Sequence, residues 1–180
     1  MRTLRVVLTG GPGAGKTTLL EALRARGCAT VSETAREIIE ARRSQGLTPR
    51  PPAQQFADEI LRRDIGKYLA KVRDDGPAFF DRSVVDALGM VDEVRPLPER
   101  ELRALLAMYP YHREVFAFPP WEAIYCNDAA RDQTFEEATR VHREVTRWYR
   151  RCGYEVVEVP RLAVPERCAY VLGRLGRTDA

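Results

Sequence analysis

The sequence predicts a three-layer α/β architecture, in which five parallel strands form one sheet with helices on both of its faces. Two observations lead to this prediction. Short runs rich in aliphatic and β-branched residues alternate with longer stretches of helical periodicity along most of the chain. With 180 residues and 44% hydrophobic content, the chain can bury one core, so we expect a single domain over residues 1–180.

The first half of the chain is expected to supply three strands and three helices. A helix over Lys16–Arg26 has leucines at helical spacing and Gly27 as its stop. Thr34 and Glu37 have the spacing of a capping box, which predicts that a helix starts near Thr34. The other expected elements are strands over Leu4–Leu8, Ala29–Ser32 and Ala78–Asp81, a loop over Leu47–Pro52, and a long amphipathic helix over Ala53–Val72.

The second half continues the alternation and contains one polar stretch. Thr134 and Glu137 form a second capping box, which opens a helix that runs to Arg151 and is ended by Gly153. Residues 119–133 begin with prolines and continue as a polar, irregular stretch, and we expect them to form a lid segment. The remaining expected elements are helices over Val84–Val94, Pro98–Met108 and Val164–Leu175 and strands over Val115–Phe118 and Tyr154–Val159.

The strongest local pattern lies between the first expected strand and the first expected helix. It reads Gly10-Gly11-Pro12-Gly13-Ala14-Gly15-Lys16-Thr17-Thr18 and satisfies G-x-x-x-x-G-K-[ST]. This is the context of a phosphate-binding P-loop. We therefore predict a P-loop NTPase fold of the kinase-like type, in which residues 119–133 form the lid segment. Glycines allow positive φ and let backbone N–H groups approach phosphate oxygens. The residues expected to bind the nucleotide are Gly11, Gly13, Ala14, Gly15, Lys16, Thr17 and Thr18.

Lys16 and two acidic residues near strand ends are candidates for catalysis. Lys16 would contact the β- and γ-phosphates of the nucleotide, and the Thr17 hydroxyl and the Asp81 carboxylate would hold Mg²⁺. Glu33 follows the second strand, where a carboxylate can orient an attacking hydroxyl group. Two structural alternatives stay open: Asp81 as the N-cap of the helix at Val84, and Glu33 as a surface acid stabilised by a helix start.

Several arginines could bind anionic groups of a substrate. Arg36 lies one turn beyond Glu33 and could bind an anionic acceptor or pair with Glu33, and Arg82 directly follows Asp81 and could do either. Arg131, in the expected lid segment, is the candidate cation for the transferring phosphoryl group, and Arg140 is a weaker candidate. For each of them, a solvated surface arginine is the alternative interpretation.

Aromatic residues beside prolines could line a pocket or could anchor loops by packing. Trp121 and the Tyr109-Pro110-Tyr111 cluster are the residues to which both interpretations apply. His142 lies between Arg140 and Arg143 on an expected helix, and we place it on the surface. The side of this helix that is expected to be buried carries Phe135, Val141, Val145, Trp148, Tyr149 and Cys152.

Composition limits the partners and the compartment of the protein. The net charge is only +3, and the acidic and basic residues are interspersed and form no basic stripe. Nucleic acid is therefore not an expected partner. The cysteines lack zinc-ligand spacing and are expected as reduced thiols. Because no apolar run resembles a signal peptide or a membrane span, we expect a cytoplasmic protein; peripheral lipid contact and a monomer or homodimer stay open.

A resemblance to known proteins extends over six segments: Val7–Thr18, Ser32–Arg36, Phe80–Ser83, Phe118–Trp121, Thr134–Ala138 and Gly153–Glu155. They resemble an AAA-type family of small P-loop domains, which groups the ribosylnicotinamide kinase domain of the NadR type with the TRP-translocation-defect nucleotide-binding proteins. The layout is also similar to deoxynucleoside kinases, which place a glutamate after the second strand and an acid-Arg-Ser triplet after the third. This similarity implies that Glu33 is the catalytic carboxylate and that Asp81 and Arg82 lie at the metal and the phosphates.

The leading functional hypothesis is a Mg²⁺-dependent kinase that moves the γ-phosphoryl group of ATP onto a hydroxyl of a small metabolite, with a nucleoside-like acceptor as one candidate. The alternative is a regulatory switch or hydrolase that binds ATP or GTP and recruits a protein or an acidic phospholipid, since the family includes proteins thought to bind GTP and phospholipid. The chain has no N-K-x-D or T-K-x-D sequence of the kind that reads guanine. Its loop Pro160–Val164, at the corresponding place, could stack an arginine on adenine.

Overall fold

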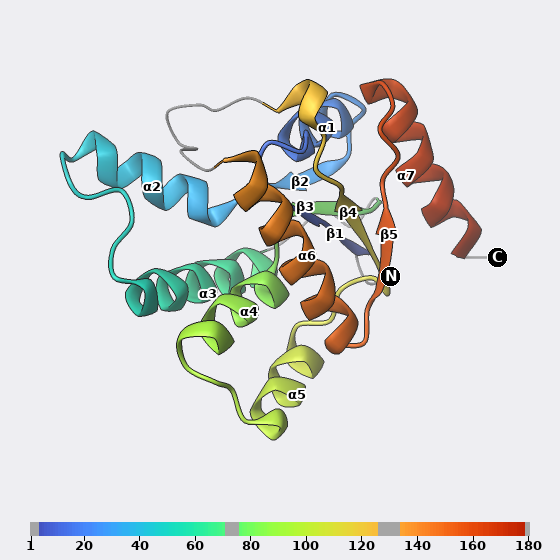
Figure 1. The fold of residues 1–180 in the computed structure, drawn as a ribbon. Coiled ribbons are helices and arrows are strands. Elements are labelled where there is room, and N and C mark those ends of the chain that lie inside the picture. The colour runs from blue at the N-terminus through green and yellow to red at the C-terminus, as the bar shows by residue number, and fades with distance from the viewer. Residues whose placement is uncertain (1–3, 71–75, 126–133, 179–180) are drawn as a thin grey trace.

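Five parallel strands form the central sheet of the protein, as seen in a computed structural model that describes residues 4–70, 76–125 and 134–178 (Figure 1). The strands lie in the order β2-β3-β1-β4-β5, and each pairs in parallel with its neighbours. They are β1 (Arg5–Gly10), β2 (Ala29–Val31), β3 (Ala78–Asp81), β4 (Glu114–Phe118) and β5 (Glu155–Glu158). The predicted five-stranded parallel sheet is therefore confirmed.

Helices cover both faces of this sheet, as predicted. On one face α1 and α7 pack on the strands, and on the other face lie α3, α4, α5 and α6, with α2 packed on α3 (Figure 1). The elements between the strands are α1 (Lys16–Ala25), α2 (Thr34–Ser44), α3 (Ala53–Leu69), α4 (Val84–Val94), α5 (Glu99–Met108), the short η1 (Glu122–Ile124), α6 (Phe135–Arg151) and, after the last strand, α7 (Val164–Thr178). The helix expected to reach Val72 ends at Leu69, and Val72 itself lies outside the described residues.

Consecutive residues of the central strand enter different hydrophobic cores. Val6 and Leu8 of β1 pack with α1 and α7, whereas Val7 packs with the helices of the opposite face. Successive side chains of a strand point to opposite faces of its sheet, so a strand covered on both faces reads as a continuous apolar run. None of the described helices combines the length and the apolar character needed to cross a bilayer.

The two predicted capping boxes have different outcomes. At the start of α6 the box is present, because the Thr134 hydroxyl accepts from the Glu137 amide and the Glu137 carboxylate accepts from the Thr134 amide. At the start of α2 the predicted box is wrong, although the helix does begin at Thr34. There the Thr34 hydroxyl donates to Asp64 of α3, and Glu37 accepts from the hydroxyl of Ser32.

The start of α4 is capped by Ser83, whose hydroxyl accepts from the amides of Val85 at 3.0 Å and Asp86 at 3.4 Å. This arrangement overturns the interpretation of Asp81 as the N-cap. A serine oxygen two or three residues before an unpaired amide is a favourable cap, so Asp81 is not needed for this purpose. Its carboxylate is left for another role.

The inner face of α6 differs from the expected one by a small rotation. Its buried residues are Ala138, His142, Thr146 and Tyr149. His142 is 7% exposed, so its placement on the surface is wrong, and burial lowers the pKa of its imidazole. Of the side expected to be buried, only Tyr149 is fully buried. Phe135, Val141, Val145, Trp148 and Cys152 are half-buried.

Candidate active site

The start of α1, which directly follows the P-loop, has features that favour the binding of an anion. Gly15 is the N-cap of α1, has a φ of 82°, and has no side chain that could bond to the first amides of the helix. The first turn of α1 contains no acidic residue. Neither a side-chain cap nor an acidic residue of the first turn therefore offsets the N-terminal amides and the positive end of the helix dipole. Gly11 is required for another reason, since a Cβ there would lie 2.3 Å from the carbonyl oxygen of Ala138 in α6.

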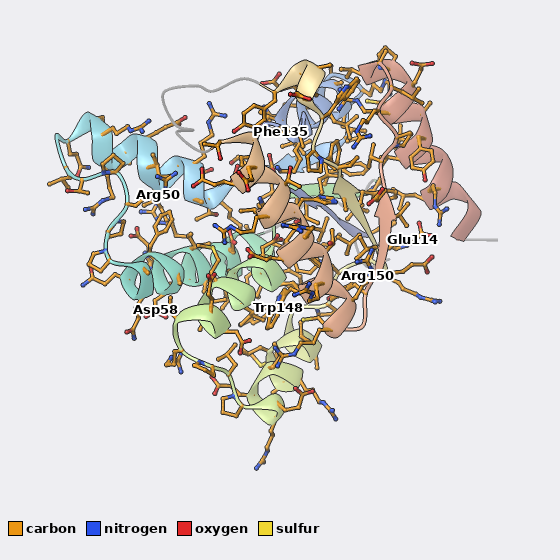
Figure 2. All side chains as sticks on the ribbon, viewed as in Figure 1. Arg50, Asp58, Glu114, Phe135, Trp148 and Arg150 are labelled. Carbon is orange, nitrogen blue, oxygen red and sulfur yellow. The ribbon has the colours of Figure 1, made fainter. Side chains whose placement is uncertain are left out.

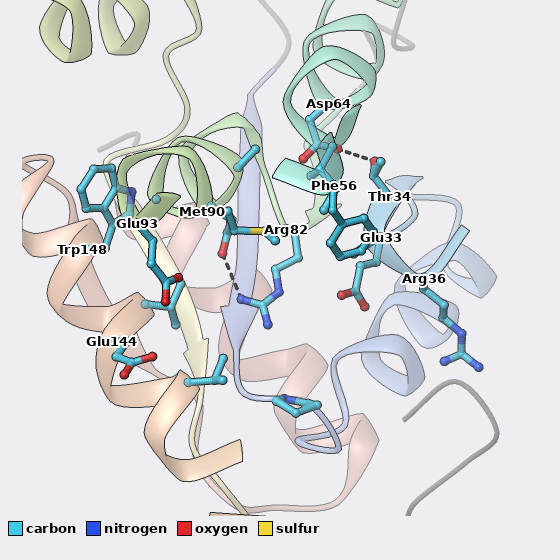
Figure 3. A pocket seen from close by; sticks show the side chains of 18 of the residues that line it. Glu33, Thr34, Arg36, Phe56, Asp64, Arg82, Met90, Glu93, Glu144 and Trp148 are labelled. Atoms are coloured by element: carbon cyan, nitrogen blue, oxygen red, sulfur yellow. Dashed lines mark hydrogen bonds and ion pairs between the residues drawn. The ribbon is translucent and has the colours of Figure 1, made fainter. Parts of the chain in front are cut away.

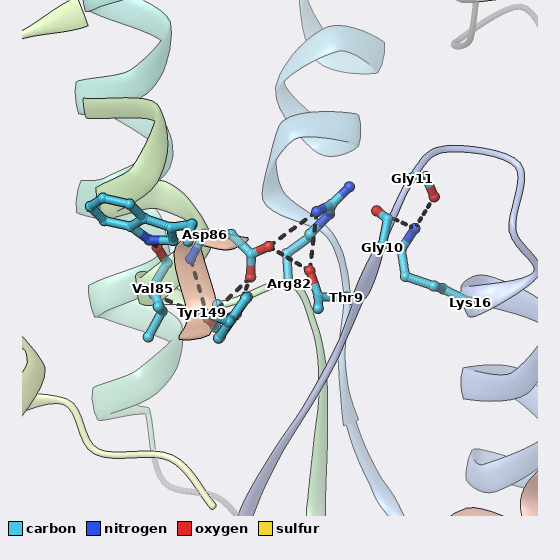
Figure 4. Close-up of polar contacts among 10 residues, drawn as sticks. Thr9, Gly10, Gly11, Lys16, Arg82, Val85, Asp86 and Tyr149 are labelled. Atoms are coloured by element: carbon cyan, nitrogen blue, oxygen red, sulfur yellow. Dashed lines mark hydrogen bonds and ion pairs between the residues drawn. The ribbon is translucent and has the colours of Figure 1, made fainter. Parts of the chain in front are cut away.

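Lys16 stands at the first position of α1 and is only 4% exposed. Its ammonium donates to the carbonyls of Gly11 at 2.8 Å and Gly10 at 3.4 Å, so it lies over its own loop (Figure 4). A compact cation in this position can neutralise charge on a phosphate that binds the loop.

Asp81 ends β3 beside these groups and is 4% exposed. Burial raises the pKa of its carboxyl to about 6, while the nearby positive charges of Lys16 and Arg82 oppose this shift. Its Oδ1 atom is buried and has no hydrogen-bond partner among the described residues. A divalent cation would supply the missing partner for this oxygen.

Thr17 and Asp81 offer a hydroxyl and a carboxylate of the kind that would suit Mg²⁺. Within the described ranges, no group of three or more His, Cys, Asp or Glu side chains is arranged to hold a metal. Magnesium does not need such a cage, because it commonly uses one or two protein oxygens and keeps several waters. A hydroxyl and a carboxylate are oxygen donors of the kind it prefers.

A cavity of about 670 Å³ extends from the P-loop into the space between α2, α3, α4 and α6 (Figure 3). Its volume is within the range of small-molecule sites. Its apolar lining comes mainly from Ile39, Phe56, Ile60, Met90, Val145 and Trp148. Of the residues predicted for the site, it is lined by Lys16, Glu33, Arg36, Arg82 and Arg140.

Glu33 lies at the N-cap position of α2 and makes no capping hydrogen bond. In the part of the chain that the structure describes, its carboxylate makes no ion pair or hydrogen bond, and it projects into the same space as the guanidinium of Arg82 (Figure 3). It is half-buried and lines the cavity, which does not match the alternative of a solvated surface acid.

Arg82 has a strained backbone, with φ 72°, the one positive value at a non-glycine residue in the described ranges. Its guanidinium donates to Asp86 at 3.0 Å and to the Thr9 hydroxyl at 3.2 Å (Figure 4). Strain of this kind persists where the surroundings hold the residue in place. Arg82 therefore presents a fixed positive charge to the cavity.

Asp86 is the centre of a polar network that the sequence did not reveal. Its carboxylate accepts from the hydroxyls of Thr9 at 2.7 Å and Ser83 at 3.2 Å, and from the hydroxyl of Tyr149 (Figure 4). These partners come from β1, the start of α4 and α6. The signal lay partly in Ser83 and Asp86, three residues apart at a helix start, but Tyr149 lies 63 positions away.

Two other arginines of the cavity pair with glutamates on their own helices. Arg36 pairs with Glu40 at 2.8 Å, and Arg140 pairs with Glu144 at 3.2 Å. Arg131 lies outside the described residues, as does most of the expected lid.

The described beginning of the expected lid segment lies against the P-loop. A Cβ at Gly13 would come within 2.5 Å of the Tyr125 ring. Arg167 of α7 is buried between the two segments. Its Nη1 atom is 2.7 Å from the position of a Gly15 Cβ, and its guanidinium carbon is 5.7 Å from the centroid of the Trp121 ring. Sequence reasoning did not single out Arg167.

The aromatic residues divide into packing anchors and cavity walls. Tyr111 is buried in the core and its hydroxyl accepts from the Val84 amide at 3.2 Å, so the packing interpretation of the Tyr109-Pro110-Tyr111 cluster is the correct one. Trp148 is a wall of the cavity instead. It lies on α6 (Figure 2), and its indole nitrogen donates to the Val85 carbonyl of α4 at 2.8 Å.

Comparison with known proteins agrees with this architecture. Residues 5–167 match the model of a family described as an AAA domain. Comparison with curated proteins found no match.

Among solved structures, the NadR protein in complex with NR is similar at 20% identity and a TM-score of 0.66, over 97% of this chain and 51% of the other. The chain thus spans about half the length of that protein. Deoxyadenosine kinase from M. mycoides with bound dATP is similar at 13% identity and a TM-score of 0.56, over 96% and 99% of the two chains. Thymidylate kinase from Candida albicans is similar at 9% identity and a TM-score of 0.63, over 99% and 93%.

These likenesses show the fold, a three-layer P-loop fold shared with kinases. The match to the family model covers most of the sequence and includes the P-loop, Glu33 and Asp81. The chain belongs to this AAA-domain family of P-loop proteins.

Proposed function

We propose that the chain is a Mg²⁺-dependent phosphotransferase that moves the γ-phosphoryl group of ATP onto a hydroxyl of a small metabolite. The observation that carries this proposal is the cavity itself. It is lined by Lys16 of the P-loop, by Glu33 and Arg82, and by the apolar wall between α3, α4 and α6. A nucleotide on the loop and an acceptor against this wall would share one space, as direct transfer requires.

Each residue has a role in the proposed reaction. The acceptor hydroxyl oxygen bonds to the γ-phosphorus while the bond from that phosphorus to the bridging oxygen of ADP breaks. Glu33 accepts the proton of the hydroxyl, and Lys16 and the loop amides bind the charge on the phosphates. Arg82, held by Asp86, offers a further positive charge. Thr17 and Asp81 would hold Mg²⁺, which would supply neutralisation of phosphate charge.

The acceptor is proposed to be a small molecule with a partly apolar body, such as a nucleoside. The wall beyond Arg82 carries Phe56, Met90 and Trp148, with Asp92 and Glu93 at its edge. Aromatic and aliphatic side chains with a few polar groups are typical of sites for such ligands. The kinases with bound nucleotides among the structural neighbours support this choice.

The test is ATP turnover with Mg²⁺ against a panel of nucleosides, nicotinamide riboside and other small hydroxyl metabolites. Product mass and ADP release are followed together. We expect one compound to gain about 80 Da while ADP release rises with it, as phosphoryl transfer to a hydroxyl requires. Tight nucleotide binding with slow hydrolysis, no phosphorylated compound and a clear preference for GTP over ATP would support the regulatory switch instead.

A further inference from the structure

Glu33 lies between two residues that are both held by α3. The carbonyl of Ser32 accepts a hydrogen bond from the Lys67 ammonium at 2.7 Å. The hydroxyl of Thr34 donates to Oδ1 of Asp64, which lies three residues before Lys67 on the same helix. Helix α3 therefore fixes the backbone just before Glu33 and the side chain just after it.

The same contacts continue into the first turn of α2. Lys67 also pairs with Glu37, with its Nζ atom 2.9 Å from Oε2. The other carboxylate oxygen of Glu37 accepts from the hydroxyl of Ser32. Lys67 thus ties together the two ends of the segment that carries Glu33. The Glu33 carboxylate takes part in none of these contacts and projects into the cavity (Figure 3).

Asp64 borders the cavity and holds Thr34 through one of its carboxylate oxygens. It is 7% exposed, and its Oδ2 atom is sealed from solvent and has no hydrogen-bond partner among the described residues. Oδ1 holds Thr34, so the contact of Asp64 with the segment that carries Glu33 runs through this one oxygen. Burying a carboxyl group with one unpaired oxygen is costly, so the site is expected to serve a purpose beyond packing.

We propose that Asp64 and Lys67 are positioning residues, which hold the Glu33 carboxylate at the reacting hydroxyl by clamping the residues on both of its sides. This inference rests on the proposed function, because it takes Glu33 as the group that accepts the proton. A general base must lie about 2.6–3.2 Å from the proton donor, so a small displacement of its segment lowers the rate. The clamp takes the place of the capping box that the sequence predicts at Thr34. The carboxylate of Glu33, at the N-cap position of α2, therefore makes no capping hydrogen bond.

The test compares single and double variants of the clamp in the phosphoryl-transfer assay. Thr34→Val and Asp64→Leu should each lower kcat by about tenfold, because each releases the same side of the segment. The acceptor KM and the ATP Kd should stay within about twofold, and the double variant should lose no more than either single one. Asp64→Asn keeps an oxygen acceptor for Thr34 and should retain kcat.

Matched variants on the same helix separate positioning from general damage. Lys67→Met should lower kcat, whereas Arg63→Met, which removes an ion pair with Glu59 on the surface of α3, should not. Thr34→Val in a Glu33→Gln background should have no further effect on kcat. A raised acceptor KM with unchanged kcat in Asp64→Leu, or full kcat in Thr34→Val, would overturn the clamp.

Hydrogen exchange tests the clamp without any turnover. The Glu37 amide donates to the Glu33 carbonyl at 3.4 Å, in the first turn of α2. Its exchange should become about tenfold faster in Thr34→Val and Lys67→Met and stay unchanged in Arg63→Met. If the wild-type protein phosphorylates no acceptor, the proposed function fails, while this measurement still decides the clamp. Unchanged exchange in both clamp variants would refute it.

Discussion

The two ends of the cavity are built in different ways. The P-loop end is one contiguous segment, Gly10–Thr18, whose shape follows from local backbone conformation, with Gly13 and Gly15 at positive φ. The opposite end is assembled from separate helices, which bring Phe56, Met90 and Trp148 together. A short sequence pattern can therefore predict the nucleotide end, whereas the acceptor end depends on tertiary packing. The two ends should respond to substitution independently, and the following predictions test this.

The largest effect is expected at the P-loop. Lys16→Ala should lower kcat/KM for ATP by about a thousandfold and weaken ATP binding, because a buried positive charge beside the phosphates is removed. Calorimetry for binding and ADP release for turnover check this. Arg24→Ala is the control, since Arg24 is exposed on the same helix and donates to Thr30. Undiminished ATP affinity in Lys16→Ala would contradict the assignment of this end to the nucleotide.

The effect of Glu33→Gln should be smaller than that of Lys16→Ala and larger than that of a substitution at the acceptor wall. We expect ATP binding to be nearly unchanged and kcat to fall by at least about a hundredfold, the scale of general acid–base catalysis. Single-turnover and steady-state rates, together with ATP titration, measure the two quantities. Glu101→Gln serves as the control because Glu101 is exposed on α5 and does not line the cavity. Full activity of Glu33→Gln would remove Glu33 from the mechanism.

Asp64→Asn should change the pH dependence of stability. Burial raises the pKa of Asp64 from its ordinary value of 3.8 to about 7; the Thr34 hydrogen bond and Lys67 of α3 oppose this, and Asp86 of α4 and Glu33 add to it. Because the folded state favours the protonated acid, the wild-type protein loses stability as pH rises toward 7, and an asparagine does not. The advantage of Asp64→Asn in unfolding free energy should grow by about 2 kcal/mol between pH 5 and pH 8.

Urea unfolding of both proteins at several pH values measures this difference. Asp58→Asn, at an exposed position of α3, controls for the general removal of an acidic charge. A constant difference between wild type and Asp64→Asn across this range would show that the Asp64 carboxyl does not take up a proton on folding.

The smallest effect is expected at the acceptor wall. Met90 is half-buried and lines the cavity from α4, so Met90→Ala should raise the acceptor KM by about tenfold through lost apolar contact. The ATP Kd should not change. Met108→Ala removes the same side chain from an exposed position of α5 and should alter neither constant. A weakened ATP affinity in Met90→Ala would mean that the two ends are not independent.

Most of the fold could be predicted from the sequence because its signals are local. The apolar runs gave the strands, and β3 has the predicted bounds of Ala78–Asp81. The capping box at Thr134 formed as its spacing predicts, with both side chains bonded to the first turn of α6. At Thr34 the same pattern failed, because Asp64, 30 residues further along the chain, offers the hydroxyl a buried carboxylate. Local propensity is overridden where a distant partner is stronger.

The candidate site was predictable only in part, for the same reason. The P-loop, Glu33 and Asp81 stand directly at or after strand ends, so the topology of a parallel sheet indicates their place. Asp86 and Arg167 were missed because their partners come from distant segments. His142 was misplaced because its neighbours in sequence are charged, although its spacing from Ala138, Thr146 and Tyr149 marks the buried face of α6.

The positions of the two tryptophans make the ends of the cavity optically separable. Trp148 lines the acceptor wall, and Trp121 stacks near Arg167 beside the P-loop. Indole fluorescence responds to changes in its surroundings, so occupancy of each end should alter a different emitter. Trp121→Phe would leave a protein whose emission reports the acceptor, and Trp148→Phe one that reports the nucleotide. The order in which the two substrates bind could then be followed without labels.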